Sequence, residues 1–162
     1  MRKLISSIIA IVSIVSTVVT MQASAAESKQ SFNPQQFAKD YFAAWTATQS
    51  PTATKKALEH YLSFLADNVG HQHYPYDSDD TRADDAKKKM RKGMTYYLGA
   101  HTKYSAKLLD VTHDFNVVVI KYESAIKAVH PQNGQVIERT STTLEVLEIE
   151  DGKVSLIRKY SE

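Results

Sequence analysis

The sequence contains no cysteine and only five glycines and four prolines in 162 residues. Without a thiol, the chain has no disulfide, no cysteine nucleophile and no thiolate metal ligand, and it tolerates an oxidising compartment. The few glycines form no phosphate-binding loop, and none frames a serine in a nucleophile elbow. These absences argue against cysteine and serine nucleophiles and against nucleotide-binding loops.

The chain also lacks an excess of charge of either sign. It has 20 basic and 18 acidic residues, and the first 25 residues hold two of the basic ones and none of the acidic ones. The rest of the chain therefore carries no formal net charge. A basic run at residues 87–92 follows four aspartates, which is typical of a solvated helix face. We expect no nucleic-acid partner, because such a partner requires a basic stripe.

The first 25 residues have the three parts of a secretory signal peptide. Arg2 and Lys3 give a positive start, residues 4–21 are uncharged, and Ala23-Ser24-Ala25 provides the small residues of a cleavage site. We predict cleavage after Ala25 and a periplasmic or secreted protein that leaves the membrane. The alternative is an uncleaved anchor, because the apolar run is about long enough to span a bilayer.

After a flexible arm at residues 26–32, we predict one domain over residues 33–162, and its first half has helical patterns. Asn33, followed by Pro34 and Gln36, has the composition of a helix start, with a capping side chain and a proline in the first turn. Apolar residues then recur at helical spacing. The predicted helices cover residues 33–48, 57–65 and 81–98.

From residue 103 onward, polar and apolar residues alternate, as they do in β-strands. Val118, Ile120 and Tyr122 fall on one face and charged residues on the other, so we predict that the first face points inward. Asn133-Gly134 is a strong hairpin signal. The predicted strands cover residues 69–76, 103–111, 116–129, 135–149 and 153–160.

Helices followed by an antiparallel meander predict an α+β fold. Each helix carries a single apolar stripe, so the helices must cover one face of the sheet. We therefore expect a cone-shaped barrel, in which a curved, mostly antiparallel sheet wraps around the N-terminal helices. The open end of such a cone is a common ligand site.

Several stretches, taken in this order, resemble the nuclear transport factor two-like superfamily, in particular its SnoaL-like and ketosteroid-isomerase-like branch. They are residues 40–45 (DYFAAW), 64–69 (FLADNV), 116–120 (NVVVI), 148–154 (EIEDGKV) and 158–160 (RKY). The resemblance implies a cone-shaped α+β barrel, frequent homodimers and no obligatory cofactor. It does not imply one activity, because the fold hosts isomerases, cyclases, dehydratases, hydrolases and non-catalytic binders.

The resemblance also points to candidate catalytic residues. Tyr41 matches a tyrosine that donates a hydrogen bond to the developing oxyanion, and His73 falls where the isomerases hold their general base. A histidine suits that role near neutral pH. The position expected for a second oxyanion acid, eight residues before the hairpin glycine, is Leu144, so we expect ketosteroid isomerisation itself to be lost. Alternatively, Tyr41 and His73 only line the cavity or fill the core.

His71 and His73 lie two residues apart on a predicted strand and so share a face. A His-x-His pair can hold a metal ion if a third ligand is near, and His101, His113 and Asp77 are the possible thirds. Spacing fixes none of them. We predict no metal site and no cofactor.

The leading interpretation is an exported domain whose cavity binds a small, largely apolar or aromatic molecule. One alternative is a cofactor-independent acid/base enzyme of the isomerase, cyclase or lyase type that uses His73 and Tyr41. Another is a dimeric interaction module with a filled cavity and no ligand. The candidate ligand-binding residues are Trp45, His71, Ile120, Tyr122 and Ser124.

Overall fold

The computed structural model describes residues 32–162. The predicted signal peptide, residues 1–25, and all but the last residue of the predicted arm at 26–32 lie outside the described residues. Residues 32–162 lie within one compact unit. Its helices are α1 (Pro34–Gln49), α2 (Lys55–Leu62) and α3 (Ala86–Tyr97).

The first two helices begin at side-chain caps. The side-chain oxygen of Asn33 accepts a hydrogen bond from the Gln36 N–H at 3.0 Å, and that of Thr54 accepts one from the Ala57 N–H at 3.2 Å. Each cap satisfies one of the amides that the first turn of a helix leaves without a partner. The predicted helix start at Asn33 is confirmed.

The third helix is shorter than predicted, because it begins at Ala86 and not at residue 81. In the preceding segment, Asp77 accepts a hydrogen bond from the Asp79 N–H, and Asp79 accepts one from the Thr81 N–H. Such local bonds between side chains and backbone compete with helical hydrogen bonds. These hydrogen bonds favour a non-helical backbone before Ala86, so α3 begins later than the apolar spacing predicts.

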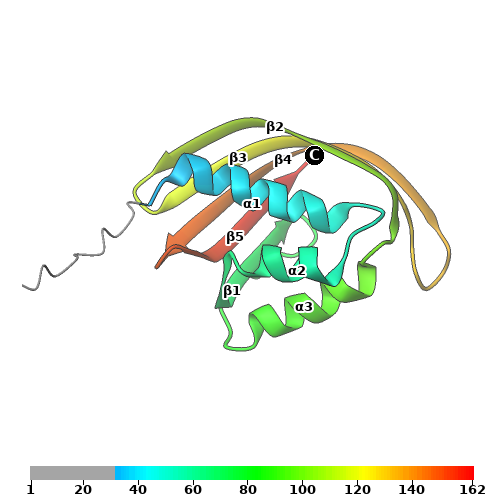
Figure 1. Ribbon diagram of the computed structural model, residues 1–162, viewed down its shortest axis with the longest axis horizontal. Helices are drawn as coiled ribbons and strands as arrows, with labels where there is room; N and C mark the ends of the chain where they lie inside the picture. The colour runs from blue at the N-terminus through cyan, green and yellow to red at the C-terminus, as the bar shows by residue number, and fades with distance from the viewer. Residues whose placement is uncertain (1–31) are drawn as a thin grey trace, which may run out of the picture. The chain divides into compact units, whose positions relative to one another are not determined.

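The strands form one mixed sheet in the order β1-β5-β4-β3-β2. β1 pairs with β5 in parallel, and the other neighbours are antiparallel. The long strands β2, β3 and β4 curve over α1 (Figure 1). This is the predicted α+β fold with a curved, mostly antiparallel sheet. The strands are β1 (Leu65–Tyr74), β2 (His101–Asp114), β3 (Val117–Val129), β4 (Val136–Glu150) and β5 (Lys153–Ser161).

β1 begins four residues earlier than predicted. Residues 66–68 have the composition of a turn, but they remain in the strand, because the pairing with β5 is irregular between Leu65 and Gly70. Their polar side chains find partners outside the core; Asp67, for example, forms an ion pair with Lys87 at 3.0 Å. The irregular pairing between β1 and β5 therefore accommodates residues 66–68 within the strand, although their composition predicts a turn.

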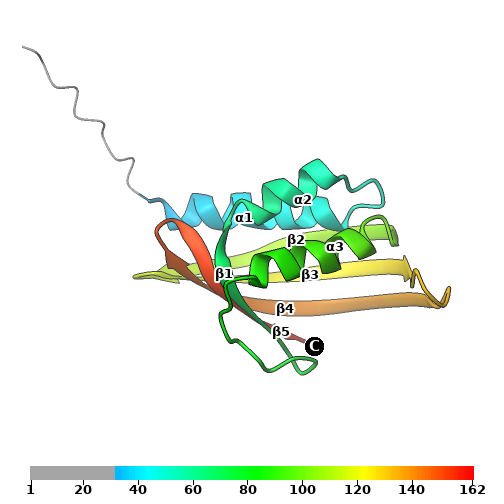
Figure 2. The same cartoon turned by 90° about the horizontal axis from the view of Figure 1, so that it is seen from below.

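The three helices lie on the same side of the sheet (Figure 2). The interior face of β3 is buried as its alternation predicts, with Val118, Ile120 and Tyr122 each at most 1% exposed. Tyr41 of α1 packs into the same core and is fully buried. Between residues 32 and 162, no helix is both long and apolar enough to cross a membrane.

Candidate functional site

An open cleft of about 630 Å³ lies between α3, the end of α1 and the strands β3 and β4. We call it the outer cleft. Its volume lies in the range of ligand sites for small organic molecules. Its apolar lining residues include Met90, Met94, Leu98, Ile126, Ala128 and Ile137.

The outer cleft continues into a smaller hollow of about 230 Å³, which we call the inner chamber. Gln49, His73, His101, Ile126 and Arg139 line both hollows, so these residues form the neck between them. The inner chamber is more polar. Its other lining residues are Trp45, Tyr104, Tyr122, Ser124, Ser141, Thr143, Lys159 and Ser161.

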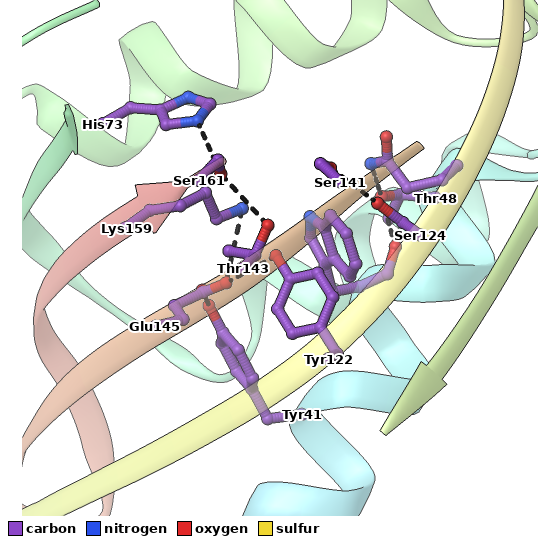
Figure 3. A network of polar contacts seen from close by, with 12 residues as sticks. Tyr41, Thr48, His73, Tyr122, Ser124, Ser141, Thr143, Glu145, Lys159 and Ser161 are labelled. Carbon is purple, nitrogen blue, oxygen red and sulfur yellow. Dashed lines mark hydrogen bonds and ion pairs between the residues drawn. The ribbon is translucent and has the colours of Figure 1, made fainter. Parts of the chain in front are cut away.

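A buried carboxylate, Glu145 on β4, lies behind the wall of the inner chamber. Its side chain is 1% exposed. It accepts a hydrogen bond from the Tyr41 hydroxyl at 2.6 Å and another from the Tyr122 hydroxyl at 3.0 Å, and Lys159 Nζ lies 3.3 Å away (Figure 3). A buried charge needs such partners, because its desolvation otherwise costs several kcal/mol.

The tyrosines around Glu145 are held in their protonated form. Burial raises the pKa of Tyr41 and of Tyr122 above the ordinary value, and the neighbouring Glu145 carboxylate raises both further. A protonated tyrosine hydroxyl is the donor that the carboxylate requires. The hydroxyls of Tyr41 and Tyr122 are therefore committed to Glu145.

Lys159 of β5 brings a positive charge to the inner chamber. Its side chain is only 11% exposed, and its ammonium lies 4.6 Å from the centre of a Trp45 ring, in a cation–π arrangement. Cross-strand pairing sets its position, because Glu145 and Lys159 are direct partners in the β4–β5 ladder. This one cross-strand pair therefore positions both charged side chains, Glu145 and Lys159.

His73, near the end of β1, faces the neck. Its Nε2 lies 3.5 Å from Ser161 Oγ, which in turn lies 3.0 Å from Thr143 Oγ1 (Figure 3). Partial burial lowers the pKa of His73 to about 4, and the charge of Lys159 lowers it as well. The imidazole is therefore neutral at pH 7.

The structure separates the residues that sequence analysis singled out into two groups. Trp45, His73, Tyr122 and Ser124 line the inner chamber. Tyr41, His71 and Ile120 line neither hollow.

The prediction that Tyr41 offers its hydroxyl to a ligand does not fit this geometry. The Tyr41 side chain is fully buried, and its hydroxyl is bound to Glu145 and lies 3.3 Å from the Tyr61 hydroxyl. His71 shares a face of β1 with His73, and Ile120 shares a face of β3 with Tyr122, but Ile120 is fully buried and neither residue lines a hollow. Face alternation places a residue inside the cone, but it does not say whether a neighbour covers it.

Sequence analysis also missed the interior acid. Counting back from the hairpin glycine selected Leu144, but that side chain is 41% exposed, and the buried side chain is that of Glu145. Burial alternates without a break along β4 from Ser141 to Ile149, so Leu144 falls on the outer face and Glu145 on the inner face. Alternation contained the signal, because Glu145 shares its face with Leu147 and Ile149 and is the single acid there.

No group of three or more His, Asp or Glu side chains in the part of the chain that the structure describes could hold a metal ion. His71 and His73 have ring centroids 6.4 Å apart. The possible third ligands named from the sequence do not complete a site with them.

No family model matches the sequence, and no curated protein matches it. Solved structures do match the fold. A protein of Shewanella denitrificans OS-217 that carries the name SnoaL-like polyketide cyclase aligns with a TM-score of 0.62 and 10% identity, over 80% of this chain and 90% of that one. An NTF2-like protein of unknown function from Exiguobacterium sp. 255-15 aligns with a TM-score of 0.57 and 12% identity, over 78% of this chain and 98% of that one.

The chain has the nuclear transport factor two-like fold. A third structure, an LEH-like epoxide hydrolase of M. tuberculosis, aligns with a TM-score of 0.57 and 16% identity, over 78% of this chain and 84% of that one. The fold expected from the resemblance is therefore confirmed. At these identities the likeness extends to the fold and not to an activity, because this fold carries many functions.

Proposed function

We propose that this nuclear transport factor two-like protein binds a small, largely apolar molecule. The outer cleft receives the apolar body of the ligand, and the inner chamber receives its polar end. The observation that carries the proposal is the continuity of the two hollows, an apolar cleft of about 630 Å³ that narrows into a polar chamber. Concave, mostly apolar sites with a few convergent polar groups are typical of small-molecule binding.

Two further points support a ligand over an interaction module with a filled cavity. Side chains leave both hollows open in the described part of the chain. Several structural neighbours also carry names of enzymes with organic substrates, a polyketide cyclase and an epoxide hydrolase among them. Those names describe the neighbours, and they suggest an organic ligand here by analogy. Homodimerisation remains a prediction from the resemblance.

Gly93 on α3 allows a direct test of the cleft. It lines the outer cleft, and a Cβ added there meets no atom within 4 Å. We expect Gly93→Phe to fill the cleft and to weaken binding of decanol, a neutral apolar probe, by roughly tenfold or more, equivalent to about 1.4 kcal/mol. Isothermal titration calorimetry measures the affinity.

Gly93→Ala is the matched control, because it adds one methyl group and leaves the cleft open. We expect it to bind decanol like the wild type and to raise the free energy of unfolding by about 0.5–1 kcal/mol, since glycine weakens a helix interior. If Gly93→Phe binds decanol as tightly as Gly93→Ala does, the ligand does not occupy the outer cleft.

We also propose that the protein acts outside the cytoplasm, on the basis of the predicted signal peptide at residues 1–25. Expression with this segment intact should give a soluble protein whose N-terminal sequence begins at Ala26. Mass spectrometry of material extracted from that protein would identify a co-purified ligand. An intact N-terminus in a membrane fraction contradicts export with cleavage.

An acid/base enzyme is the second candidate function, and the observation that favours it is His73 at the neck. The neutral imidazole can accept a proton from a molecule that reaches the inner chamber. A base with a pKa of about 4 is, however, a weak proton acceptor at pH 7. The hydroxyl of Tyr41, the expected second catalytic group, is occupied by Glu145. We therefore favour ligand binding over catalysis as the function of this protein.

The pH dependence of His73 can be measured without a substrate. Its pKa is about 4 in the folded protein, below the value of about 6.5 in an unfolded chain. Between these values the unfolded state binds more protons, so the stability of the protein should fall as the pH is lowered from about 6.5 to about 4. We expect the His73 ring signals in nuclear magnetic resonance to remain those of a neutral imidazole down to about pH 5.

A His73→Gln variant assigns these signals and should lose part of the pH dependence of stability. A titration midpoint at or above 6.5 would show that the ring is solvated like a surface histidine. The enzyme candidate would then lose the positioned base on which it depends.

A further inference from the structure

The hollows contain an imbalance of charge. Two permanently charged side chains, Arg139 and Lys159, line them, whereas none of the residues lining either hollow is an aspartate or a glutamate. Glu145 lies behind the wall and partly balances Lys159 at 3.3 Å. The positive charge of Arg139 therefore has no counterpart within the cavity.

Arg139 differs from the other arginines that the structure describes. Arg82, Arg91 and Arg158 each form an ion pair with a carboxylate at 2.6–2.8 Å. Arg139 forms none in residues 32–162, and its guanidinium donates a hydrogen bond to the neutral hydroxyl of Tyr76 at 3.1 Å. Its guanidinium has five N–H donors, so most of its hydrogen-bonding capacity remains available.

The location of Arg139 matches the polar end of an elongated ligand. It lines both hollows at the neck, so a molecule that fills the outer cleft brings one end to the guanidinium. Beyond that point, Ser161, Thr143 and Lys159 offer further donors. Apolar side chains such as Met90 and Met94 line the outer cleft but not the inner chamber.

We propose that the ligand is an amphipathic carboxylate, with its apolar chain in the outer cleft and its carboxylate bound by Arg139 at the neck. This inference rests on the proposed function and names the chemical class of its ligand. A carboxylate fits because its two oxygens match the planar fork of an arginine and form two parallel charge-assisted hydrogen bonds. The nearby charge of Lys159 adds attraction at longer range.

Decanoate and decanol are a suitable pair of probes, because they share one chain and differ in the head group. We expect residues 26–162 of the wild-type sequence to bind decanoate about tenfold to a hundredfold more tightly than decanol at pH 7, as for a hydrogen bond to a charged group. Arg139→Gln should remove this preference and leave decanol binding unchanged, and Arg139→Lys should keep part of it. Titration calorimetry gives all affinities.

Arg91→Gln is the control for loss of a positive charge elsewhere, since Arg91 lies on α3 but lines neither hollow. It should keep the preference for decanoate. Equal binding of the two probes by the wild type, or an unchanged preference in Arg139→Gln, overturns the carboxylate assignment and leaves the proposed function in place. Failure of both probes to bind overturns both proposals.

Discussion

Glu145→Ala is expected to lower the free energy of unfolding by about 3–5 kcal/mol, the range for breaking a buried ion pair from one side. The substitution leaves the largely buried ammonium of Lys159 without its carboxylate. It also removes the acceptor for the hydroxyls of Tyr41 and Tyr122, which are buried with it. Chemical denaturation followed by circular dichroism measures the loss.

Two variants distinguish this burial effect from a general effect of removing an acid. Glu138→Ala removes an exposed glutamate of the same strand, whose ion pair with Lys127 spans 3.2 Å, and should change stability by no more than about 0.5 kcal/mol. The double variant Glu145→Leu/Lys159→Met replaces both charges with apolar groups and should recover much of the loss. Equal effects of Glu145→Ala and Glu138→Ala would contradict a buried network.

Gly70→Ala is expected to destabilise the protein by about 1–3 kcal/mol, the usual cost of overpacking a core. Gly70 lies in β1, and a Cβ there would collide with the backbone oxygen of Asp80 and come within 2.5 Å of Leu156 Cδ1. Relief requires the segment around Asp80 to shift, which strains the ion pair of Asp80 with Arg158 at 2.9 Å. Thermal and denaturant unfolding measure the effect.

Gly93→Ala provides the comparison, because the same change at an open helix position should stabilise the protein. The two substitutions should therefore have opposite signs. A neutral Gly70→Ala would mean that the segment around Asp80 moves away at little cost. In that case the close approach of this segment to β1 is not a fixed feature of the fold.

Local sequence rules succeeded where one element determines the outcome by itself. The cap at Asn33 depends on a bond across three residues, and the alternation of Val118, Ile120 and Tyr122 depends on one strand. The same rules failed at the start of α3, where aspartate side chains compete with helical hydrogen bonds. They also failed in β1, where pairing with β5 keeps in the strand residues whose composition predicts a turn.

The composition of the candidate site was only partly predictable. Trp45 and Tyr122 were found because helical spacing and strand alternation place them on interior faces, and His73 was found from the family resemblance; all three line the inner chamber. Arg139 was missed because its place in the lining depends on the fold bringing β4 and α3 to one cleft, although Arg139 lies more than 40 residues from α3 in the chain.

By itself, the sequence determined the fold class, the order of the elements and the interior face of the long strands, because periodicity and caps are properties of short segments. Only the tertiary structure decided which groups surround Glu145, since Tyr41, Tyr122 and Lys159 reach it from α1, β3 and β5. It also decided that the Tyr41 hydroxyl donates to Glu145 and that Tyr41 lines neither hollow. Contacts of this kind join strands and helices far apart in the chain. The pattern within one segment shows that a residue is interior, but it does not show which other side chain shields it from the cavity.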